Sequence, residues 1–310
     1  MSNSFWTANL CVPQWKETLN QLWTGNPPKL LDPTPAKRSI HIPPDCEIRL
    51  AVIKDSGAIS EFWSRYFSIS TSCRCAVSKE FILKSMASGR WQTIVAVVND
   101  QIVGTIVRRY LKGLHIYETR WTNAGMIDYF CIHPSWRNRG IGRCLLDTIH
   151  NITGLPMAPH LIFWEGLRPT LPPLVCGWFW SKRCNGTETA ILLKTKEEIL
   201  QAWKNCVKGE YIWTEEPGDE ISVWKIKETS VIVWNTMHLT IPDGKPIGIV
   251  LSDLDSATLL ANTKSYWGVL LTPQASPFAQ KGWIVDSIFQ WIGYNLSVGR
   301  FTTHFPKLGC

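Results

Sequence analysis

Residues 126–146 read Met-Ile-Asp-Tyr-Phe-Cys-Ile-His-Pro-Ser-Trp-Arg-Asn-Arg-Gly-Ile-Gly-Arg-Cys-Leu-Leu, and this stretch decides the predicted fold. Its first seven residues form a mostly apolar run that predicts a strand, and His133 follows the strand's end. A helix is expected to begin near Gly140, because apolar residues recur at helical spacing between Leu145 and Ile149. The stretch therefore predicts a strand, a glycine-containing loop and an amphipathic helix, in that order.

The loop between this strand and this helix has the pattern Arg137-x-x-Gly140-x-Gly142. Glycine lets the backbone approach a phosphate closely and adopt dihedral angles that other residues avoid. The first-turn amides of the helix and its dipole favour an anion, and arginine side chains add charge-assisted hydrogen bonds. The pattern predicts a nucleotide-phosphate site, although an ordinary strand–helix turn with surface arginines has the same pattern.

The composition suits a globular protein of two domains. The chain has 310 residues, of which 45% are apolar and 18% charged, so it can build a sizeable core. The formal net charge of +7 suits an anionic partner such as a nucleotide phosphate. Because no run of five Lys or Arg residues occurs, we expect no nucleic-acid partner.

The cysteines and the N-terminal residues indicate which cellular compartment the protein occupies. None of the ten cysteines forms a C-x2-C pair, so we expect no metal site. The first residues lack the basic and apolar regions of a secretory signal, and no apolar run approaches the roughly 18 residues of a transmembrane helix. These features predict a cytoplasmic protein with reduced thiols and no transmembrane segment.

The chain divides into an arm and two structured parts. Residues 1–46 contain seven prolines, which favour an extended arm. Residues 47–186 show regular patterns. In this part we expect a helix between Ile59 and Phe67 and strands at Glu47–Ile53, Thr93–Val98, Ile102–Val107, Met126–Ile132 and Leu161–Trp164.

Residues 187–310 are predicted to repeat this order. We expect helices around Ile199–Trp203 and at Lys281–Tyr294, and strands at Ala190–Lys194, Val231–Thr240, Ile247–Leu251, Trp267–Leu271 and Arg300–Phe305. Matching positions have similar offsets: Trp63 to Trp203 is 140 residues, Gly104 to Gly248 is 144, and Ile127 to Val269 is 142. These offsets predict two related halves, although α/β proteins produce such coincidences readily.

The glycine loop resembles the acyl-CoA-binding motif of the GNAT superfamily of N-acyltransferases. In that family the strand before the loop splays from its neighbour, and its amides hold the pantetheine and polarise the thioester carbonyl. The resemblance implies an α/β fold of tandem GNAT-like lobes, each a mixed, mostly antiparallel sheet flanked by helices, over residues 47–186 and, in degenerate form, 187–310. The coenzyme A-binding residues that it implies are Ile132, Arg137, Asn138, Arg139, Gly140, Ile141, Gly142 and Arg143.

Further blocks are similar to those of the N-myristoyltransferases, two-lobed relatives within the GNAT group. Ile127-Asp-Tyr-Phe-Cys-Ile-His resembles their I-N-F-L-C-V-H stretch. Four other blocks agree in order: Phe5-Trp6-Thr7 with Val12-Pro13-Gln14 resembles F-W-x-T-Q-P-V-P, Ser78–Leu83 resembles S-P-E-F-L-L, Ile116–Thr119 resembles I-Y-D-T, and Phe179–Lys182 resembles Y-W-H-R. The resemblance therefore covers roughly residues 5–185.

This narrower resemblance implies catalytic roles for three residues of the strand. In N-myristoyltransferases the backbone amides of the F-L pair form the oxyanion hole, and these positions fall on Tyr129 and Phe130. Asp128 replaces the family's Asn, and it is expected either to accept the proton of the amine or to face a neighbour in the sheet. Cys131 and His133 are expected to be structural.

Two features depart from the N-myristoyltransferase pattern, and a third concerns the C-terminus. The family's R-S-K-R-x-A-P loop is Arg137–Arg143 here, which is closer to general acetyltransferases. The family's acidic peptide-recognition loop is replaced by Ser68–Val77, which retains Arg74 but lacks the acids. The family uses its C-terminal carboxylate as a base, and the corresponding group in this sequence is the Cys310 carboxylate.

Three functions are therefore weighed. The first is an N-acyltransferase of the N-myristoyltransferase type, which moves an acyl chain from myristoyl-CoA to the N-terminus of a peptide or protein. The second is a short-chain acetyltransferase that uses acetyl-CoA. The third is a degenerate protein that binds acyl-CoA without turnover. We expect a monomer that binds acyl-CoA in the first lobe, with the acceptor in the groove between the lobes.

Overall fold

The structure is a computed structural model of the chain. It describes residues 15–31, 42–70, 73–152, 158–165, 172–183, 187–234, 239–240, 247–251, 254–261, 263, 267–272, 283–294, 296–298 and 307–308. The predicted strand Arg300–Phe305, the Cys310 carboxylate and the two blocks between Phe5 and Gln14 lie outside the described residues.

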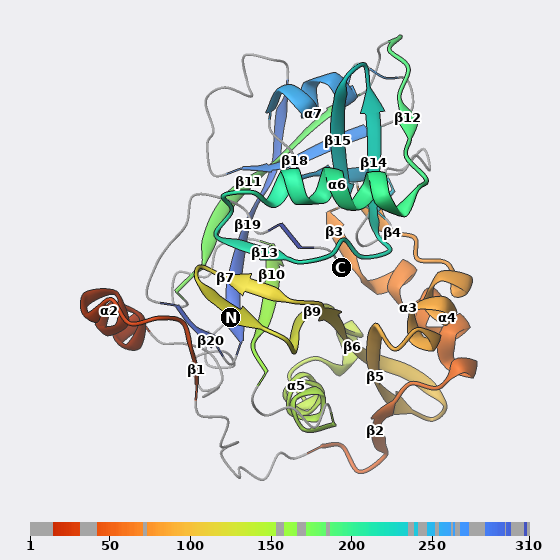
Figure 1. Cartoon of the computed structure of the whole chain (residues 1–310). Helices are drawn as coiled ribbons and strands as arrows, with labels where there is room; N and C mark the ends of the chain where they lie inside the picture. The colour runs from red at the N-terminus through yellow and green to blue at the C-terminus, as the bar shows by residue number, and fades with distance from the viewer. Residues whose placement is uncertain are drawn as a thin grey trace.

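The first half contains four helices and eleven strands among its described residues (Figure 1). Its N-terminal elements are α2 (Trp15–Thr24), β1 (Lys29–Leu30), β2 (Cys46–Leu50), the 3-10 turn η1 (Ile53–Asp55), α3 (Ser56–Tyr66), β3 (Ser68–Ser70), β4 (Cys73–Cys75) and α4 (Lys79–Ala87). The others are β5 (Trp91–Val98), β6 (Gln101–Leu111), β7 (Leu114–Ile116), β8 (Thr119–Trp121), β9 (Ala124–Ile132), η2 (Pro134–Trp136), α5 (Ile141–Ile152), β10 (His160–Glu165) and β11 (Val175–Arg183).

The second half begins with a strand and a helix, as the first does after its arm. Its described elements are β12 (Ile191–Leu192), α6 (Lys196–Val207), β13 (Ile212–Thr214), β14 (Ile221–Ile226), β15 (Thr229–Trp234), β16 (Leu239–Thr240), β17 (Ile247–Val250), α7 (Leu254–Ala261), β18 (Trp267–Thr272), β19 (Ile284–Tyr294) and β20 (Leu296–Ser297).

One sheet joins both halves. Its twelve described strands run in the order β12-β14-β15-β17-β18-β11-β19-β10-β9-β6-β5-β2. From either edge of the sheet inward, the strands of the two halves are connected in the same order. Each half contains one parallel pair that a helix connects: α5 joins β9 to β10, and α7 joins β17 to β18. The fold is therefore α/β with tandem, related sheets, as the sequence predicts.

The two central strands are exchanged between the halves. β11 belongs to the first half but pairs with β18 of the second, and β19 of the second half pairs with β10 of the first. β11 and β19 also pair with each other, so the sheet is continuous across the middle. This exchange ties the halves together through backbone hydrogen bonds rather than through side chains alone.

Two predictions about the second half are wrong. Lys281–Tyr294 was expected to be helical, but Ile284–Tyr294 forms β19, the strand that lies between β10 and β11. Its residues from Phe289 to Ile292 are all buried, because a central strand has no solvent face and so shows no alternation in its sequence.

The second wrong prediction concerns the repeat offsets. Gly104 lies on β6 but Gly248 on β17, and Ile127 lies on β9 but Val269 on β18. The sheet order makes β15 the counterpart of β6 and β17 the counterpart of β9, so these two pairs are not equivalent. Trp63 and Trp203 do hold corresponding places, on α3 and α6, and both are fully buried.

Helices cover both faces of the sheet (Figure 1). On one face, α3, α4 and α6 pack around a core that both halves share, which contains Trp63, Ile82 and Trp203. On the other face, α5 and α7 cover separate cores, one in each half. Along the described chain, no helix is both long and apolar enough to cross a membrane.

Candidate functional site

β9 carries a bulge at Tyr129. The register of its pairing with β6 shifts between Thr105 and Val107, and Tyr129 has a φ of 46°, in the left-handed region. This backbone conformation is costly for a bulky residue, so its surroundings must hold it. The Tyr129 amide donates to Asp128 Oδ1 at 2.7 Å, and its carbonyl accepts from Thr105 Oγ1 at 2.9 Å.

Aromatic rings hold the Tyr129 side chain. The ring is fully buried and stacks on the Trp63 ring, with centroids 4.0 Å apart. The Trp63 indole N–H donates to Thr105 Oγ1 at 2.9 Å, the same hydroxyl that donates to the Tyr129 carbonyl. The α3 helix and β6 therefore fix the bulge together.

β9 and β10 stop pairing at the bulge. The parallel ladder joins Gly125–Ile127 to His160–Ile162 and ends there, while β10 continues as far as Glu165 beside β19. The ladder between β9 and β10 therefore does not extend to Asp128–Ile132. The strand thus parts from its neighbour where the sequence resemblance implies.

The Tyr129 amide has an acceptor within β9. It was expected to hold an oxyanion, but it donates to the Asp128 carboxylate instead. The amide of Phe130, the second expected donor, stays a prediction.

The loop after β9 adopts the conformation that its glycine predicts. Gly140 has a φ of 81°, which favours glycine, and Asn138 also lies in the left-handed region at 62°. The Gly140 carbonyl accepts from the amides of Arg143 and Cys144, both at 3.1 Å, so α5 begins directly after it. First-turn amides such as that of Ile141 have no acceptor within their own helix, which leaves them able to bind an anion.

Gly142 has a packing role that the loop pattern did not predict. A Cβ at this position would lie 2.8 Å from Ile132 Cδ1 and 3.2 Å from Phe130 Cζ. Gly142 therefore lets the first turn of α5 lie against the end of β9.

Three arginines surround this turn. Arg137 Nε donates to the Ile132 carbonyl at 3.2 Å, and the Arg139 guanidinium lies 4.7 Å from the centre of the Trp136 ring. Arg143 is half-buried on α5. The structure therefore brings the predicted residues of the loop together at the end of β9.

Residues 89–165, which run from the turn before β5 to the end of β10, match the family model of the acetyltransferase (GNAT) domain. Nearly the whole chain also resembles solved structures of Saccharomyces cerevisiae N-myristoyltransferase. One, with bound myristoyl-CoA and inhibitors, has a TM-score of 0.71 at 13% identity and covers 98% of this chain and 91% of that one. Another, with bound myristoyl-CoA, has a TM-score of 0.68 at 12% identity and covers 96% and 93%.

The chain has a GNAT fold of the N-myristoyltransferase type. No curated protein matches the sequence significantly. At this low identity the solved structures define the fold, and the GNAT domain match falls on the segment that contains the bulge, the parting strands and the glycine loop.

Behind the bulge of this GNAT fold lies a buried charged triad of Arg109, Asp128 and Glu220. Arg109 Nη2 lies 2.9 Å from Asp128 Oδ2, and Arg109 Nη1 donates to Glu220 Oε2. The three residues are at most 6% exposed. The Arg109 guanidinium also lies over the rings of Trp91, at 4.7 Å, and Tyr129, at 5.1 Å.

Burial governs the protonation of the two carboxyl groups. It raises the pKa of Asp128, against the opposing effect of Arg109. Burial also raises the pKa of Glu220 to about 7, again against Arg109, and the nearby Asp128 carboxylate raises it further. The main cause in both cases is burial, which disfavours an ionised carboxyl group away from water, and Arg109 offsets it only in part.

The surroundings of Cys131 and His133 agree with the structural roles expected of them. Burial raises the pKa of the Cys131 thiol to about 12, so it remains protonated and unreactive at neutral pH. His133 Nδ1 accepts from the Ser135 amide at 3.2 Å, and its Nε2 lies 3.1 Å from the Tyr66 hydroxyl. Both nitrogens of His133 are thus used to cap η2 and to hold α3.

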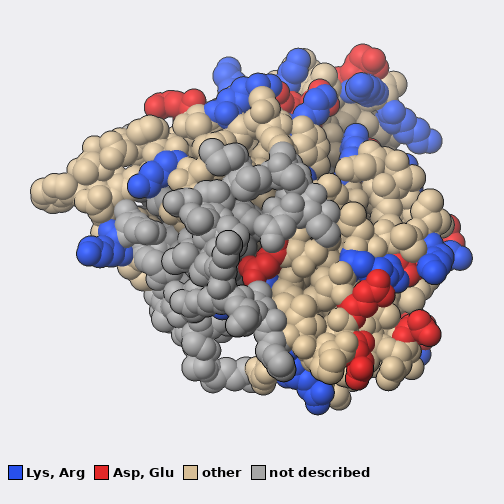
Figure 2. All heavy atoms as spheres, turned by 90° about the horizontal axis from the view of Figure 1, so that it is seen from below, with Lys and Arg blue, Asp and Glu red and all other residues tan. Residues whose placement is uncertain are grey.

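A pocket of about 460 Å³ lies at the seam between the halves. The turn from α4 to β5 forms one wall and residues 216–220 another, and Arg109 and Glu220 are among its lining residues. Seen from below, the described surface intersperses Lys and Arg with Asp and Glu and shows no field of a single sign (Figure 2). The net charge therefore does not mark a binding face there.

Sequence reasoning missed Arg109 and Glu220. A signal for Arg109 was present, because Arg108 and Arg109 interrupt the apolar strand β6. Adjacent residues of a strand point to opposite faces, so two buried arginines in a row each require polar partners. Nothing near Glu220 in the sequence identified it as the partner.

Proposed function

We propose that this chain is an acyl-CoA-dependent N-acyltransferase. The observation that carries the proposal is found at the end of β9, where the Tyr129 bulge, the parting from β10 after Ile127 and the Gly140 loop come together. The GNAT domain match over the same segment supports this class of reaction.

Acyl-CoA would lie with its pyrophosphate at the first turn of α5 and its pantetheine along β9 beyond Ile127, the last residue that pairs with β10. The amides of Ile141 and Gly142 would bind phosphate oxygens, and Arg137 and Arg139, both exposed beside them, would add charge-assisted hydrogen bonds. The proposal requires no metal.

In the reaction, a neutral amine attacks the thioester carbonyl. A C–N bond forms, the C–S bond breaks, and the electron pair leaves on the thiolate of coenzyme A. We assign the Phe130 amide, one of the two donors that the resemblance implies, to the developing oxyanion. Asp128 was expected either to accept the amine's proton or to face a neighbour in the sheet. Its two oxygens contact Arg109 of β6 and the Tyr129 amide, which supports the second role, and the amine's proton leaves with the coenzyme A thiol.

We infer that myristoyl-CoA is the donor and that the N-terminus of a peptide or protein is the acceptor. We propose that the protein acts as a monomer in the cytoplasm. The support is the fold likeness to the yeast N-myristoyltransferase that was solved with myristoyl-CoA. A short-chain acetyltransferase is the second candidate, and the Arg137–Arg143 loop, which resembles general acetyltransferases, favours it.

The experiment is release of the coenzyme A thiol from myristoyl-CoA and from acetyl-CoA, with a peptide that begins with glycine. The matched control is the same peptide with its N-terminus blocked. Release from myristoyl-CoA that needs the open N-terminus is expected. Faster release from acetyl-CoA would favour the second candidate, and binding of both donors without release would indicate a protein that only binds acyl-CoA.

A further inference from the structure

Glu220 belongs to the second half, yet it contacts the polar groups behind the bulge of the first half. It precedes β14 directly, and its carboxylate accepts from Arg109 of β6. Only 3% of the surface of Glu220 is exposed to solvent, so its interaction with Arg109 is shielded from water and from salt. A buried pair of this kind is costly to break by removing one partner alone.

A short series of contacts leads from Glu220 to the backbone of the bulge. Arg109, which Glu220 holds, contacts Asp128 Oδ2 at 2.9 Å. The other oxygen of Asp128, Oδ1, accepts from the Tyr129 amide at 2.7 Å. Each step joins adjacent groups, and the last one restrains the residue with the left-handed φ.

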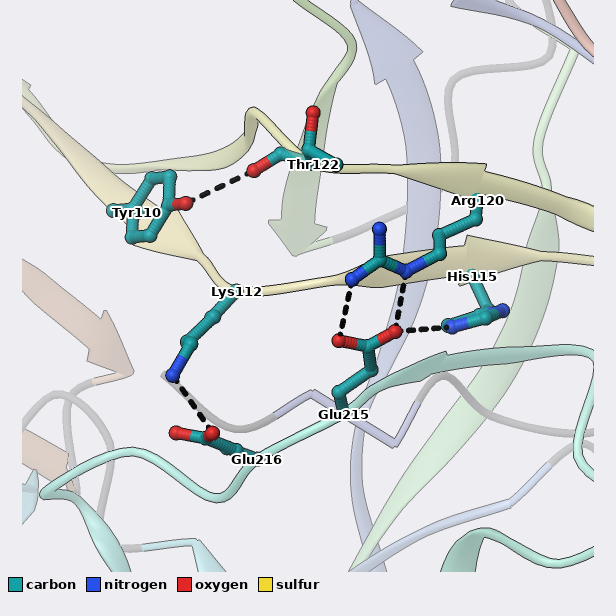
Figure 3. Close-up of polar contacts among 7 residues, drawn as sticks. All are labelled: Tyr110, Lys112, His115, Arg120, Thr122, Glu215 and Glu216. Atoms are coloured by element: carbon teal, nitrogen blue, oxygen red, sulfur yellow. Dashed lines mark hydrogen bonds and ion pairs between the residues drawn. The ribbon is translucent and has the colours of Figure 1, made fainter.

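The segment that carries Glu220 is clamped onto the first half by acidic residues. Figure 3 shows the Glu215 carboxylate between Arg120 and His115, and Glu216 turned toward Lys112. The distances are 2.8 Å from Arg120 Nη2 to Glu215 Oε2, 3.0 Å from His115 Nε2 to Oε1, and 2.7 Å from Lys112 Nζ to Glu216 Oε1.

Two further contacts complete this acidic clamp, residues 215–220. Arg90, directly before β5, pairs with Asp219 at 3.0 Å. A Cβ on Gly113 would lie 2.3 Å from the Glu215 side chain, so the glycine there makes room for it. The contacts of Glu215, Glu216 and Asp219 therefore hold the segment that leads into Glu220.

We propose that Glu220 is a positioning residue for acyl transfer, which acts through Arg109 and Asp128 on the Tyr129 bulge and so places the site of the first half under the control of the second. The inference rests on the proposed function for its effect on turnover. Its structural part, the coupling of Glu220 to the Tyr129 amide, does not depend on that function.

The charged surroundings of Glu220 make this coupling sensitive to pH. Arg109 of β6 faces it, as do Asp128 and Tyr129 of β9, and Trp234 of β15 lies beside it. The pKa of Glu220 is raised to about 7, so the group gains a proton as pH falls through neutrality. A neutral Glu220 attracts Arg109 less, which leaves the guanidinium to Asp128 alone and changes the hydrogen bond to Tyr129.

The first test observes the Tyr129 amide directly. The seven tyrosines are labelled with ¹⁵N, and the Tyr129 signal is assigned from its loss in Tyr129→Phe. In the wild-type protein the shift of this signal is expected to titrate with a midpoint of about 7. Glu220→Gln should abolish that transition, whereas Glu216→Gln, which removes a half-exposed partner of Lys112 in the same clamp, should retain it. An unchanged transition in Glu220→Gln would overturn the proposal.

The second test separates positioning from acyl-CoA binding. Glu220→Gln is expected to lower kcat about tenfold at pH 8 and to flatten its dependence on pH, with the affinity for acyl-CoA unchanged, because the α5 loop is not altered. Loss of acyl-CoA affinity together with kcat would indicate a merely structural role. If the wild-type protein binds no acyl-CoA, the proposed function fails, and the amide titration still decides whether Glu220 controls the bulge.

Discussion

The two halves of the sheet have the same order of connections but differ at one junction. β9 and β10 pair over only three residues, Gly125–Ile127 with His160–Ile162, whereas β17 pairs with β18 along all four of its residues. Both are parallel pairs bridged by a helix. The topology therefore does not by itself produce a binding slot. The bulge at Tyr129, next to the last paired residues, distinguishes the half in which the strands part.

The two halves also differ in their backbone conformation and in the charged side chain that one supplies to the other. In the first half, Tyr129 holds its left-handed φ within a strand. Among the described residues of the second half, Lys227 is the one non-glycine residue with such a φ, and it lies in the turn between β14 and β15. The second half instead supplies Glu220 to the bulge of the first. We infer that one half became the site and the other its support.

The largest expected effect comes from the two corresponding tryptophans. Trp63→Ala and Trp203→Ala should each lower the free energy of unfolding by about 3–5 kcal/mol, because each removes a fully buried indole that donates a hydrogen bond. Denaturant unfolding measures this loss. Only Trp63 stacks on Tyr129, so only its variant should also lower acyl transfer in the folded fraction. Equal losses of specific activity would contradict the proposed asymmetry.

The next effect concerns pH. Because burial raises the pKa of Glu220 from 4.5 to about 7, the native state binds more protons than the unfolded state between these values. This group therefore contributes stability that falls as pH rises through the window, by on the order of 3 kcal/mol. Urea unfolding at pH 5 and pH 8 should show a smaller decline in Glu220→Gln than in the wild type. A larger decline in the free energy of unfolding of the variant would contradict the raised pKa of Glu220.

A smaller effect is expected at Gly125, where β9 still pairs with β10. A Cβ on Gly125 would lie 2.8 Å from both Arg108 Nε and His160 Cδ2, and these two side chains hydrogen-bond at 2.9 Å. Gly125→Ala should therefore destabilise the protein by about 1–3 kcal/mol through overpacking. The matched control is Gly57→Ala on α3, where the nearest atom is 3.9 Å away, and its melting temperature should not fall. Equal melting temperatures for both variants would show that the structure accommodates a methyl group at Gly125 without loss of stability.

The smallest effect is expected at the rim of the acidic clamp. Lys112 and Glu216 are 60% and 47% exposed, so water screens their pair. Glu216→Gln should change the free energy of unfolding by about 0.2–1 kcal/mol. A loss as large as that of Trp203→Ala would mean that the clamp is held by its exposed pairs and not by the buried Arg109–Glu220 contact.

The elements around the loop could be predicted because their signals are local. The apolar run before His133 and the helical spacing after Gly140 are written in adjacent residues, and both elements formed as expected. β19 could not be predicted, since its burial on both faces removes the alternation that identifies a strand. The partner of Arg109 could not be predicted either, because only the docking of residues 215–220 brings Glu220 to it.

The central claim, that the Gly140 loop binds acyl-CoA, is tested most directly by calorimetric titration with myristoyl-CoA. Gly140 and Gly209 have nearly the same φ, 81° and 82°, which disfavours alanine at both positions, but only Gly140 lies in the loop. Gly140→Ala should weaken binding of myristoyl-CoA about tenfold, or about 1.4 kcal/mol, and Gly209→Ala should leave it unchanged. Equal affinity in both variants, or no binding by the wild-type protein, would contradict this claim.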